Sequence, residues 1–164
     1  MHFDGTSELI DNGSVAVVIS GMIREWELCI ESFNENFIKP NESSFDIDVF
    51  LVTYDVTDRY SDNRESKKKI SEQEFNNLRE QFNTKNLCVQ NFDVNKQEIL
   101  DYMNSIDNSP LVITTNHTQQ NFLETIYMQS HLLKQSLNFI NDKNKKYDSI
   151  MRTRFDILYD QKFI

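Results

Sequence analysis

The apolar run at 15–19, Val-Ala-Val-Val-Ile, constrains the fold more than any other part of the chain. It has no polar residue on either face, and such a strand is typical of a parallel sheet that helices cover on both sides. A second, mostly apolar run at 47–54 predicts another strand of the same sheet. The sequence therefore predicts a buried sheet with two covered faces.

Helical patterns separate the strand-like runs. The turn at Ser20 and Gly21 ends the first strand, and Pro40 is expected to end the helix after it. This helix is predicted to bury apolar residues at three- and four-residue spacing, namely Trp26, Cys29, Ile30, Phe33 and Phe37. Further along the chain, two capping pairs predict two more helix starts, one at Ser71 and Glu74 and one at Asn95 and Glu98.

The remaining patterns complete an alternation of strands and helices. A short strand is predicted at 87–89, and 111–113 is either a short strand or a buried loop. The longest helix is predicted over 119–140, and a last strand follows within 148–159. The inner stripe of the long helix is expected to contain Phe122, Ile126, Leu133, Leu137 and Ile140.

This order predicts an α/β fold, a Rossmann-like three-layer sandwich with a mainly parallel sheet and right-handed crossovers. Residues 1–14 are expected to form a flexible N-terminus, and 15–164 to form a single domain. The chain ends about five residues after its last strand-like segment. Such an end suggests a truncated product or half of a larger fold.

Charge and cysteine usage narrow the function classes. The net charge of −9 argues against nucleic-acid binding, which needs a basic surface. No apolar stretch reaches the roughly 20 residues of a membrane span, and no export signal precedes residue 15. Cys29 and Cys88 lie in apolar segments and are expected to be buried thiols. A reducing, cytoplasmic location is therefore predicted.

The last strand carries the clearest candidate for a site. Alternation along a strand places Met151, Thr153, Phe155 and Ile157 on one face, and Arg152, Arg154 and Asp156 on the other. Two guanidinium groups suit a diphosphate, and a carboxylate beside phosphate oxygens suits Mg²⁺ or Mn²⁺. The alternative is a solvated edge strand on which Arg154 and Asp156 form a weak ion pair.

Two loops are expected at the same edge of the sheet, where parallel strands bind ligands at their carboxyl ends. After the first strand, Ser20 and Gly21 allow close backbone approach at a helix start, and Arg24 can reach a phosphate. After the second strand, Tyr54 can stack on a base and Asp55 can accept from ribose hydroxyls. Alternatively, the first loop is an ordinary strand-to-helix turn and Asp55 caps a neighbouring element.

Three blocks of the chain resemble a family. Residues 15–24 are similar to the opening strand and "SGxxR" turn of GT-A-like glycosyltransferases of bacteria and large viruses. Residues 47–55 are similar to the second strand of those enzymes, and 147–156 to their "YDxxxRxRxD" strand, which follows a long helix with a Gln such as Gln129. The resemblance spans about 15–160, and the region between the blocks is not diagnostic.

The resemblance implies a nucleotide-sugar-binding domain. Asp156 would replace the metal-binding acid of a DxD motif and hold Mn²⁺ or Mg²⁺, while Arg154 and Arg152 would face the diphosphate. The expected function is transfer of a sugar from a nucleotide-sugar to a glycan, lipid or protein acceptor, either by this chain or by a larger protein of which it is the donor-binding half. No catalytic base can be named. The rival hypothesis is a non-catalytic α/β interaction domain that forms oligomers.

Overall fold

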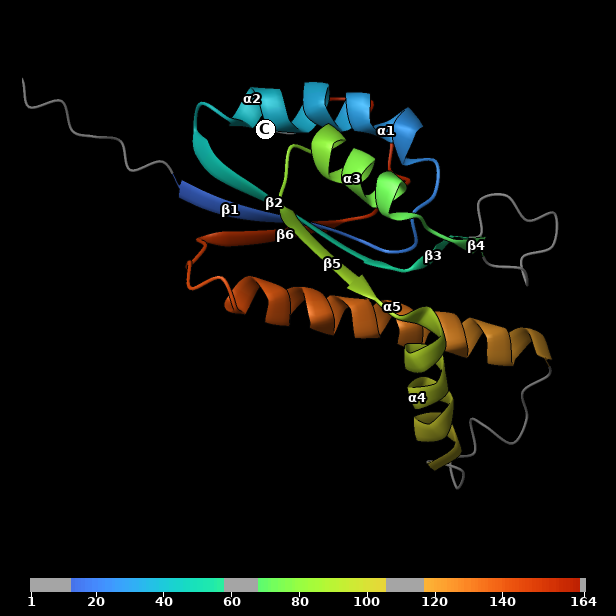
Figure 1. The fold of residues 1–164 in the computed structure, drawn as a ribbon. Coiled ribbons are helices and arrows are strands. Elements are labelled where there is room, and N and C mark those ends of the chain that lie inside the picture. The colour runs from blue at the N-terminus through green and yellow to red at the C-terminus, as the bar shows by residue number, and fades with distance from the viewer. Residues whose placement is uncertain (1–12, 58–67, 106–116, 163–164) are drawn as a thin grey trace, which may run out of the picture.

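The structure, a computed structural model, describes residues 13–57, 68–105 and 117–162 and has an α/β architecture with three layers (Figure 1). The central sheet contains β1 (Gly13–Ser20), β2 (Phe45–Tyr54), β5 (Asn86–Gln90) and β6 (Ser149–Thr153). One face is covered by α1 (Trp26–Phe33) and α3 (Glu72–Gln81), and the other by α4 (Phe92–Ser105) and α5 (His117–Asn141). The predicted Rossmann-like sandwich is confirmed.

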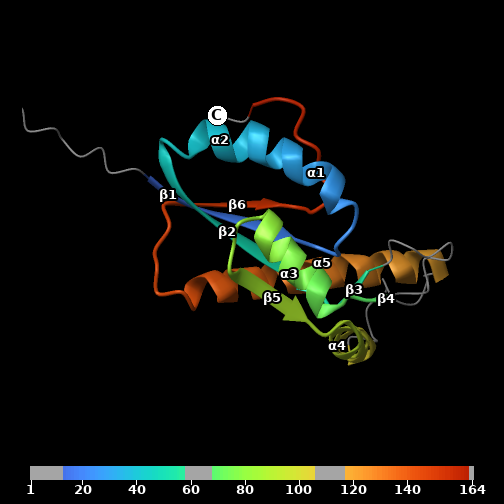
Figure 2. The same ribbon diagram turned by 45° about the horizontal axis from the view of Figure 1, so that its top comes forward.

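All strand pairings in this sheet are parallel, and the strand order is β5-β2-β1-β6. β1 and β2 align over their length, with Val17 opposite Val49, and β6 aligns with the middle of β1, with Val17 opposite Met151. β5 and β6 therefore form the two edges (Figure 2). The chain adds strands on one side of β1 and then crosses to the other side for β6.

The sheet separates two apolar cores because successive side chains of a strand point to opposite faces. Odd-numbered residues of β1, such as Val17 and Ile19, pack with α1 and α3. Even-numbered residues, such as Ala16 and Val18, pack with α4 and α5. Phe155, just after β6, belongs to the first core and is buried, as the strand pattern predicts, whereas Ile157 is 40% exposed and does not continue that face.

The first helical region extends past Pro40, contrary to the prediction. α1 continues through a π-helical turn, η1 (Asn34–Ile38), into α2 (Lys39–Asn41). Proline lacks the N–H that an α-helix interior requires, and the π turn, which ends two residues before Pro40, changes the bonding pattern of this region. The side chain of Asn41 donates to the carbonyl of Phe37 at 2.7 Å and supports this end.

The two predicted capping pairs have different outcomes. Ser71 and Glu74 form a complete capping box at the start of α3, as predicted. Asn95 does not start a helix: it lies inside α4, whose first turn is capped by Asn91, since Oδ1 of Asn91 accepts from the Val94 amide at 3.0 Å. The predicted start of this helix was one turn late because Asn91 and Asn95 are both suitable capping residues.

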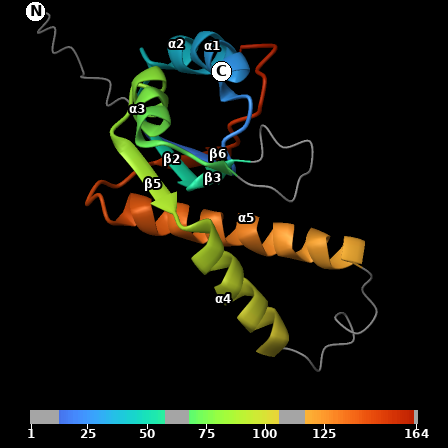
Figure 3. The same cartoon turned by 45° about the vertical axis from the view of Figure 1, so that its right-hand side comes forward.

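The long helix α5 (His117–Asn141) extends two residues before and one residue after its predicted bounds, and of the predicted inner stripe Ile140 is buried as expected. Met128, Leu132, Ser136 and Ile140 point into the core. Ile126, Leu133 and Leu137, predicted to lie inside, are each more than a third exposed. α5 crosses under the sheet and meets α4 near its N-terminal half, as Figure 3 shows.

Other sequence predictions concern smaller details. β1 begins at Gly13, so the predicted N-terminal segment 1–14 overlaps the strand by two residues. A short antiparallel pair, β3 (Val56–Thr57) and β4 (Lys68–Lys69), has no counterpart among the elements predicted above. The predicted element at 111–113 and the side chain of Phe122 lie outside what the structure describes.

Among the described helices, none combines the length and apolar character needed to cross a bilayer.

Candidate functional site

The carboxyl ends of β1 and β6 define the topological switch point of the sheet. From β1 the chain proceeds to β2 on one side, and β6 pairs with the opposite side of β1. In open α/β sheets, ligands bind where the strand order reverses, because adjacent loops diverge there. The turn containing Ser20 and Gly21 and the segment containing Arg152 and Arg154 leave the sheet at this point.

A direct contact joins the two predicted blocks. The Nε of Arg152 donates to the Oγ of Ser20 at 2.8 Å. Ser20 is fully buried at the end of β1, whereas Arg152 is exposed on the sheet face shared with α5. Because this hydrogen bond uses only one of the five N–H groups of arginine, the guanidinium retains donor capacity for an anion.

The backbone at Gly21 has a conformation that requires glycine. Its φ is +147°, in a region that residues with a Cβ rarely adopt. The amide of Gly21 donates to the carbonyl of Val52 at 3.2 Å, which fixes the turn against β2. Arg24 is half-buried in the same turn, with Nη2 4.0 Å from Sδ of Met22. Glu25, at the N-cap of α1, makes no side-chain capping bond to the helix.

Arg154 and Asp156 lie together and pair with each other. β6 ends at Thr153, so Asp156 is not on a strand face as predicted, and a turn brings it back to Arg154. Arg154 donates to both carboxylate oxygens of Asp156, from Nε at 2.9 Å and from Nη2 at 2.7 Å. This bidentate pair is the ion-pair alternative that the sequence left open, and it engages both groups.

Asp156 also lies close to the start of α1. Burial raises the pKa of the Cys29 thiol above its ordinary value, and the charges of Asp156 and Glu25 raise it further. Cys29 shares a small cavity with Thr153, Arg154 and Phe155. The segment after β6 therefore packs beside the helix that follows β1. Arg152, within β6, is the residue that contacts the Ser20–Gly21 turn.

Tyr54 does not offer its ring to a ligand. It is 1% exposed, and its hydroxyl donates to the carbonyl of Met128 in α5 at 3.0 Å. Burial raises the pKa of its hydroxyl well above the ordinary value. The prediction that this ring stacks on a base is wrong, because the ring fills the core between the sheet and α5.

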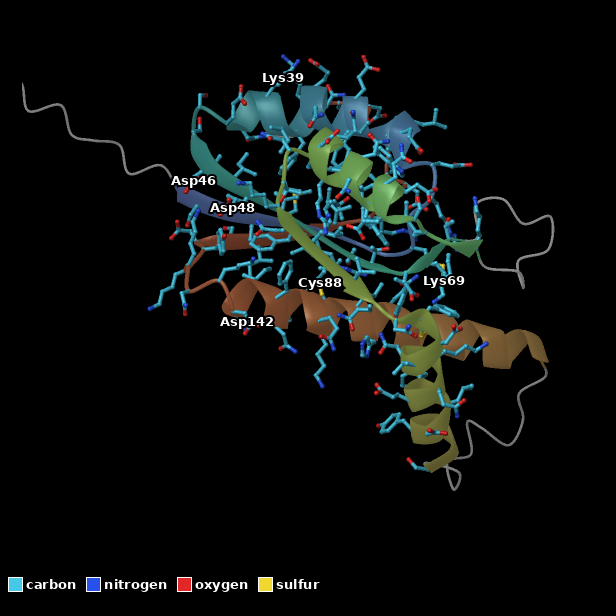
Figure 4. The ribbon with its side chains drawn as sticks, in the orientation of Figure 1. Lys39, Asp46, Asp48, Lys69, Cys88 and Asp142 are labelled. Carbon is cyan, nitrogen blue, oxygen red and sulfur yellow. The ribbon has the colours of Figure 1, made fainter. Side chains whose placement is uncertain are left out.

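Asp55 acts as a capping residue. Its carboxylate accepts from the amide of Phe92 at 2.9 Å at the start of α4, and from Nζ of Lys69 at 2.6 Å. Burial alone would raise the pKa of this carboxyl, but the bonds from Lys69 and from the Phe92 amide outweigh it and lower the pKa. The carboxylate of Asp55 and the amino group of Lys69 lie near the start of α4, where Figure 4 labels Lys69. The capping alternative therefore accounts for Asp55.

The metal prediction rests on Asp156 alone. Across 13–57, 68–105 and 117–162, no three His, Cys, Asp or Glu side chains gather in a group that could hold a metal ion. If a cation binds at Asp156, the rest of its coordination must come from water and from phosphate oxygens, as is usual for Mg²⁺.

One cluster was not predicted. At the opposite, amino end of the sheet, Nζ of Lys145 bridges Asp46 at 2.8 Å and Asp48 at 2.7 Å, and Tyr147 donates to Asp48 at 2.6 Å (Figure 4). The alternation of Asp46 and Asp48 along β2 was the available signal. These contacts join β2 to the segment that precedes β6, so the cluster accounts for packing at the end of the sheet farthest from the candidate site.

A hollow of about 70 Å³ opens beside the β1–α1 turn. It is lined by residues of α1, β3, α3 and the segments that precede α1 and α3, namely Ile23, Trp26, Glu27, Thr57, Ile70, Glu74 and Asn77. The Oγ1 of Thr57 donates to the carbonyl of Ile23 at 2.7 Å, which holds the β3 strand against the turn. The sequence offered no signal for this hollow, since its walls come from distant segments.

Comparison with known proteins finds no matching family model, no significantly similar curated protein and no significantly similar solved structure.

Proposed function

We propose that the carboxyl edge between β1 and β6 binds the diphosphate of a nucleotide-sugar, and that the chain supplies the donor-binding part of a glycosyltransferase. The observation that carries the proposal is the Ser20–Arg152 hydrogen bond of 2.8 Å, which joins the two blocks of the family resemblance at the switch point. Fold alone does not specify an activity, so the proposal rests on these side chains.

The chemistry assigned to the site is charge stabilisation. When the glycosidic bond of a nucleotide-sugar breaks, negative charge grows on the departing diphosphate, and fixed cationic groups lower the energy of that state. Arg152 and Arg154 are the groups proposed for this role. Because the net charge of the chain is −9, its overall field repels an anion. An anion must therefore be attracted to this edge by a local pair of arginines.

Ligand binding would rearrange the Arg154–Asp156 pair. Two oxygens of one phosphate group offer Arg154 the same bidentate geometry that the two carboxylate oxygens of Asp156 offer now. The released carboxylate of Asp156 would then be able to hold a divalent cation, which would neutralise phosphate charge.

Calorimetric titration of the chain with UDP-glucose and GDP-mannose, each with and without Mn²⁺, tests the proposal. We expect saturable binding of at least one donor, weakened at least about tenfold by Arg152→Ala and by Arg154→Ala, as the loss of a charge-assisted contact implies. Arg79→Ala, which removes an arginine of α3 that pairs with Glu72, is the matched control and should bind normally. Absence of binding by the folded chain to both donors, or normal binding by both site variants, contradicts the proposal.

The Asp156→Asn variant separates the two proposed roles of that carboxylate. If Asp156 holds the cation, the variant loses the part of the affinity that Mn²⁺ adds. If it serves only as the partner of Arg154, the variant frees the guanidinium, and donor affinity without metal rises. Circular dichroism must show unchanged folding in every variant.

A further inference from the structure

The indole N–H of Trp26 is a donor in a buried side chain and has no acceptor in the described part of the chain. Trp26 begins α1, is only 6% exposed, and packs its ring 6.0 Å from that of Phe82. That ring contact is its side-chain interaction within the described residues, and no hydrogen bond from the indole accompanies it. Buried indole N–H groups normally have a partner, so this exception requires an explanation.

The indole N–H of Trp26 faces open space. Across 13–57, 68–105 and 117–162, every side-chain nitrogen or oxygen that is fully covered has a hydrogen-bond partner. The indole nitrogen lacks one, so it is not fully covered. The opening that Trp26 lines is the hollow of about 70 Å³ described above. A ligand in this hollow could therefore supply the missing acceptor.

The hollow lies where the N-terminal ends of α1 and α3 meet the β3–β4 pair (Figure 1). At roughly 10–15 Å³ for each water, its 70 Å³ holds about five water molecules. Ile23 and Ile70 contribute apolar walls, whereas Glu27, Glu74 and Asn77 contribute polar ones. This mixture of apolar walls and a few polar groups is typical of a small-molecule site.

The polar walls do not suit an ion. Of the described residues that line the hollow, none is a lysine, arginine or histidine that could pair with an anion. The carboxylates of Glu27 and Glu74 lie in the first turns of their helices, where the helix dipole offsets negative charge. Glu74 also accepts from the amide of Ser71 at 2.8 Å and from its hydroxyl at 2.7 Å. An ammonium ligand carries donors only, so it would leave the Trp26 N–H without an acceptor.

We propose that the hollow binds a neutral polyhydroxylated ligand, namely one monosaccharide ring. A hydroxyl group both accepts and donates, so one ligand can accept from the indole of Trp26 and donate to a carboxylate such as that of Glu27. The side-chain amide of Asn77 can pair with a hydroxyl in either sense. The C–H groups of the ring match the walls of Ile23 and Ile70. This site uses none of the residues of the β1–β6 edge and does not rest on the proposed function.

Nuclear magnetic resonance of the full chain tests the proposal directly. Trp26 is the single tryptophan of the sequence, so its indole N–H gives one cross-peak in a proton–nitrogen correlation spectrum. The chain is titrated with glucose, galactose, mannose and N-acetylglucosamine, without nucleotide, so the result is independent of the proposed function. We expect at least one sugar to move this cross-peak saturably. The dissociation constant should be on the order of a few millimolar, as a ligand of about twelve non-hydrogen atoms allows.

Two variants of the lining and a matched control accompany the titration. Asn77→Ala leaves the reporter in place and should weaken sugar binding at least about fivefold, the effect of losing one hydrogen bond. Asn76→Ala changes the preceding residue of α3, which does not line the hollow, and should bind like the parent chain. Trp26→Phe keeps an aromatic ring but removes the donor, and calorimetry should show a similar loss. Circular dichroism checks folding, and Asn77→Ala decides the test if Trp26→Phe does not fold.

UDP-glucose and UDP distinguish two sources of the sugar. A shift by UDP-glucose but not by UDP assigns the hollow to the sugar of a donor, and a shift by free sugars alone assigns it to another glycan. Either result supports the proposal. Three results overturn it: no saturable shift with any free sugar or UDP-glucose, a shift by UDP where free sugars give none, or unchanged binding in Asn77→Ala. Tighter binding of methylammonium than of every sugar also overturns it.

Discussion

At the scale of single residues, several polar side chains link segments that are distant in the sequence. Arg152 reaches Ser20, and Asp55 connects the end of β2 to the start of α4. The carboxylate of Asp55 bonds both the Phe92 amide and Lys69, and it is 22% exposed. A carboxylate at a helix start satisfies an amide that has no partner within the helix and interacts favourably with the helix dipole.

Asp55→Ala should lower the free energy of unfolding by about 1–2 kcal/mol, the usual cost of losing a cap. Asp55→Asn keeps an oxygen acceptor but loses the charge, so it should cost about half as much. Urea denaturation measures both. Asp93→Ala is the control, since this 77% exposed residue lies 3.8 Å from the same lysine and should change stability by less than about 0.5 kcal/mol. An Asp55→Ala effect as small as that of Asp93→Ala contradicts this assignment.

At the scale of elements, the segment after β6 is attached to α1 and η1 through one tyrosine. The ring of Tyr159 lies 5.7 Å from that of Phe33 and 6.2 Å from that of Phe37. Its carbonyl accepts from Asn36 at 2.6 Å, and its hydroxyl bonds Thr153 at 2.7 Å. These contacts hold residues 154–158, including the arginine and acid of the candidate site, between two fixed points.

Tyr159→Phe should cost about 1 kcal/mol by removing the hydroxyl bond to Thr153. Tyr159→Ala should cost about 2–3 kcal/mol because it also removes the packing against Phe33 and Phe37. Chemical denaturation followed by circular dichroism gives both values. Leu158→Ala, a change at a neighbouring side chain that is 65% exposed, should have little effect. Equal effects of the two tyrosine variants would show that the ring does not anchor the segment.

At the scale of the whole molecule, ionisation makes stability depend on pH. Burial lowers the pKa of His131 below its ordinary value of 6.5, Lys134 lowers it further, and Glu98 opposes the shift. For Asp48, burial would raise the pKa, but bonds from Lys145 and Tyr147 outweigh it and lower the pKa below 3.8. In both cases the unfolded chain binds the proton more tightly, so acid favours unfolding.

The free energy of unfolding should therefore fall in two steps as the pH is lowered. The first begins near pH 6.5, as His131 is protonated in the unfolded chain, and the second begins below about pH 4, as Asp48 is protonated there. Urea titrations between pH 8 and pH 3 measure both steps. His131→Gln should remove the first step and Asp48→Asn should reduce the second. A His131→Gln profile parallel to that of the parent chain contradicts the first assignment.

The sequence by itself determined the layers and most of the elements. Apolar runs such as 15–19 have one energetically acceptable environment, a strand covered on both faces, and the Ser71–Glu74 pair satisfies a helix start with its own side chains. These signals are local, so they can be recognised in the sequence without knowledge of the fold. The resemblance also brought Ser20 and Arg152 into one hypothesis, although they are far apart in the chain.

The tertiary structure alone decided the strand order, the buried side of α5 and the partners of the polar groups. Tyr54 and Asp55 have side chains that suit a ligand, yet packing against α5 buries the first and the start of α4 engages the second. Apolar residues occur on two flanks of α5, and only the position of the sheet selects Leu132 over Leu133. Such choices depend on which distant surface covers a residue, and that information lies in the packed molecule rather than in local sequence.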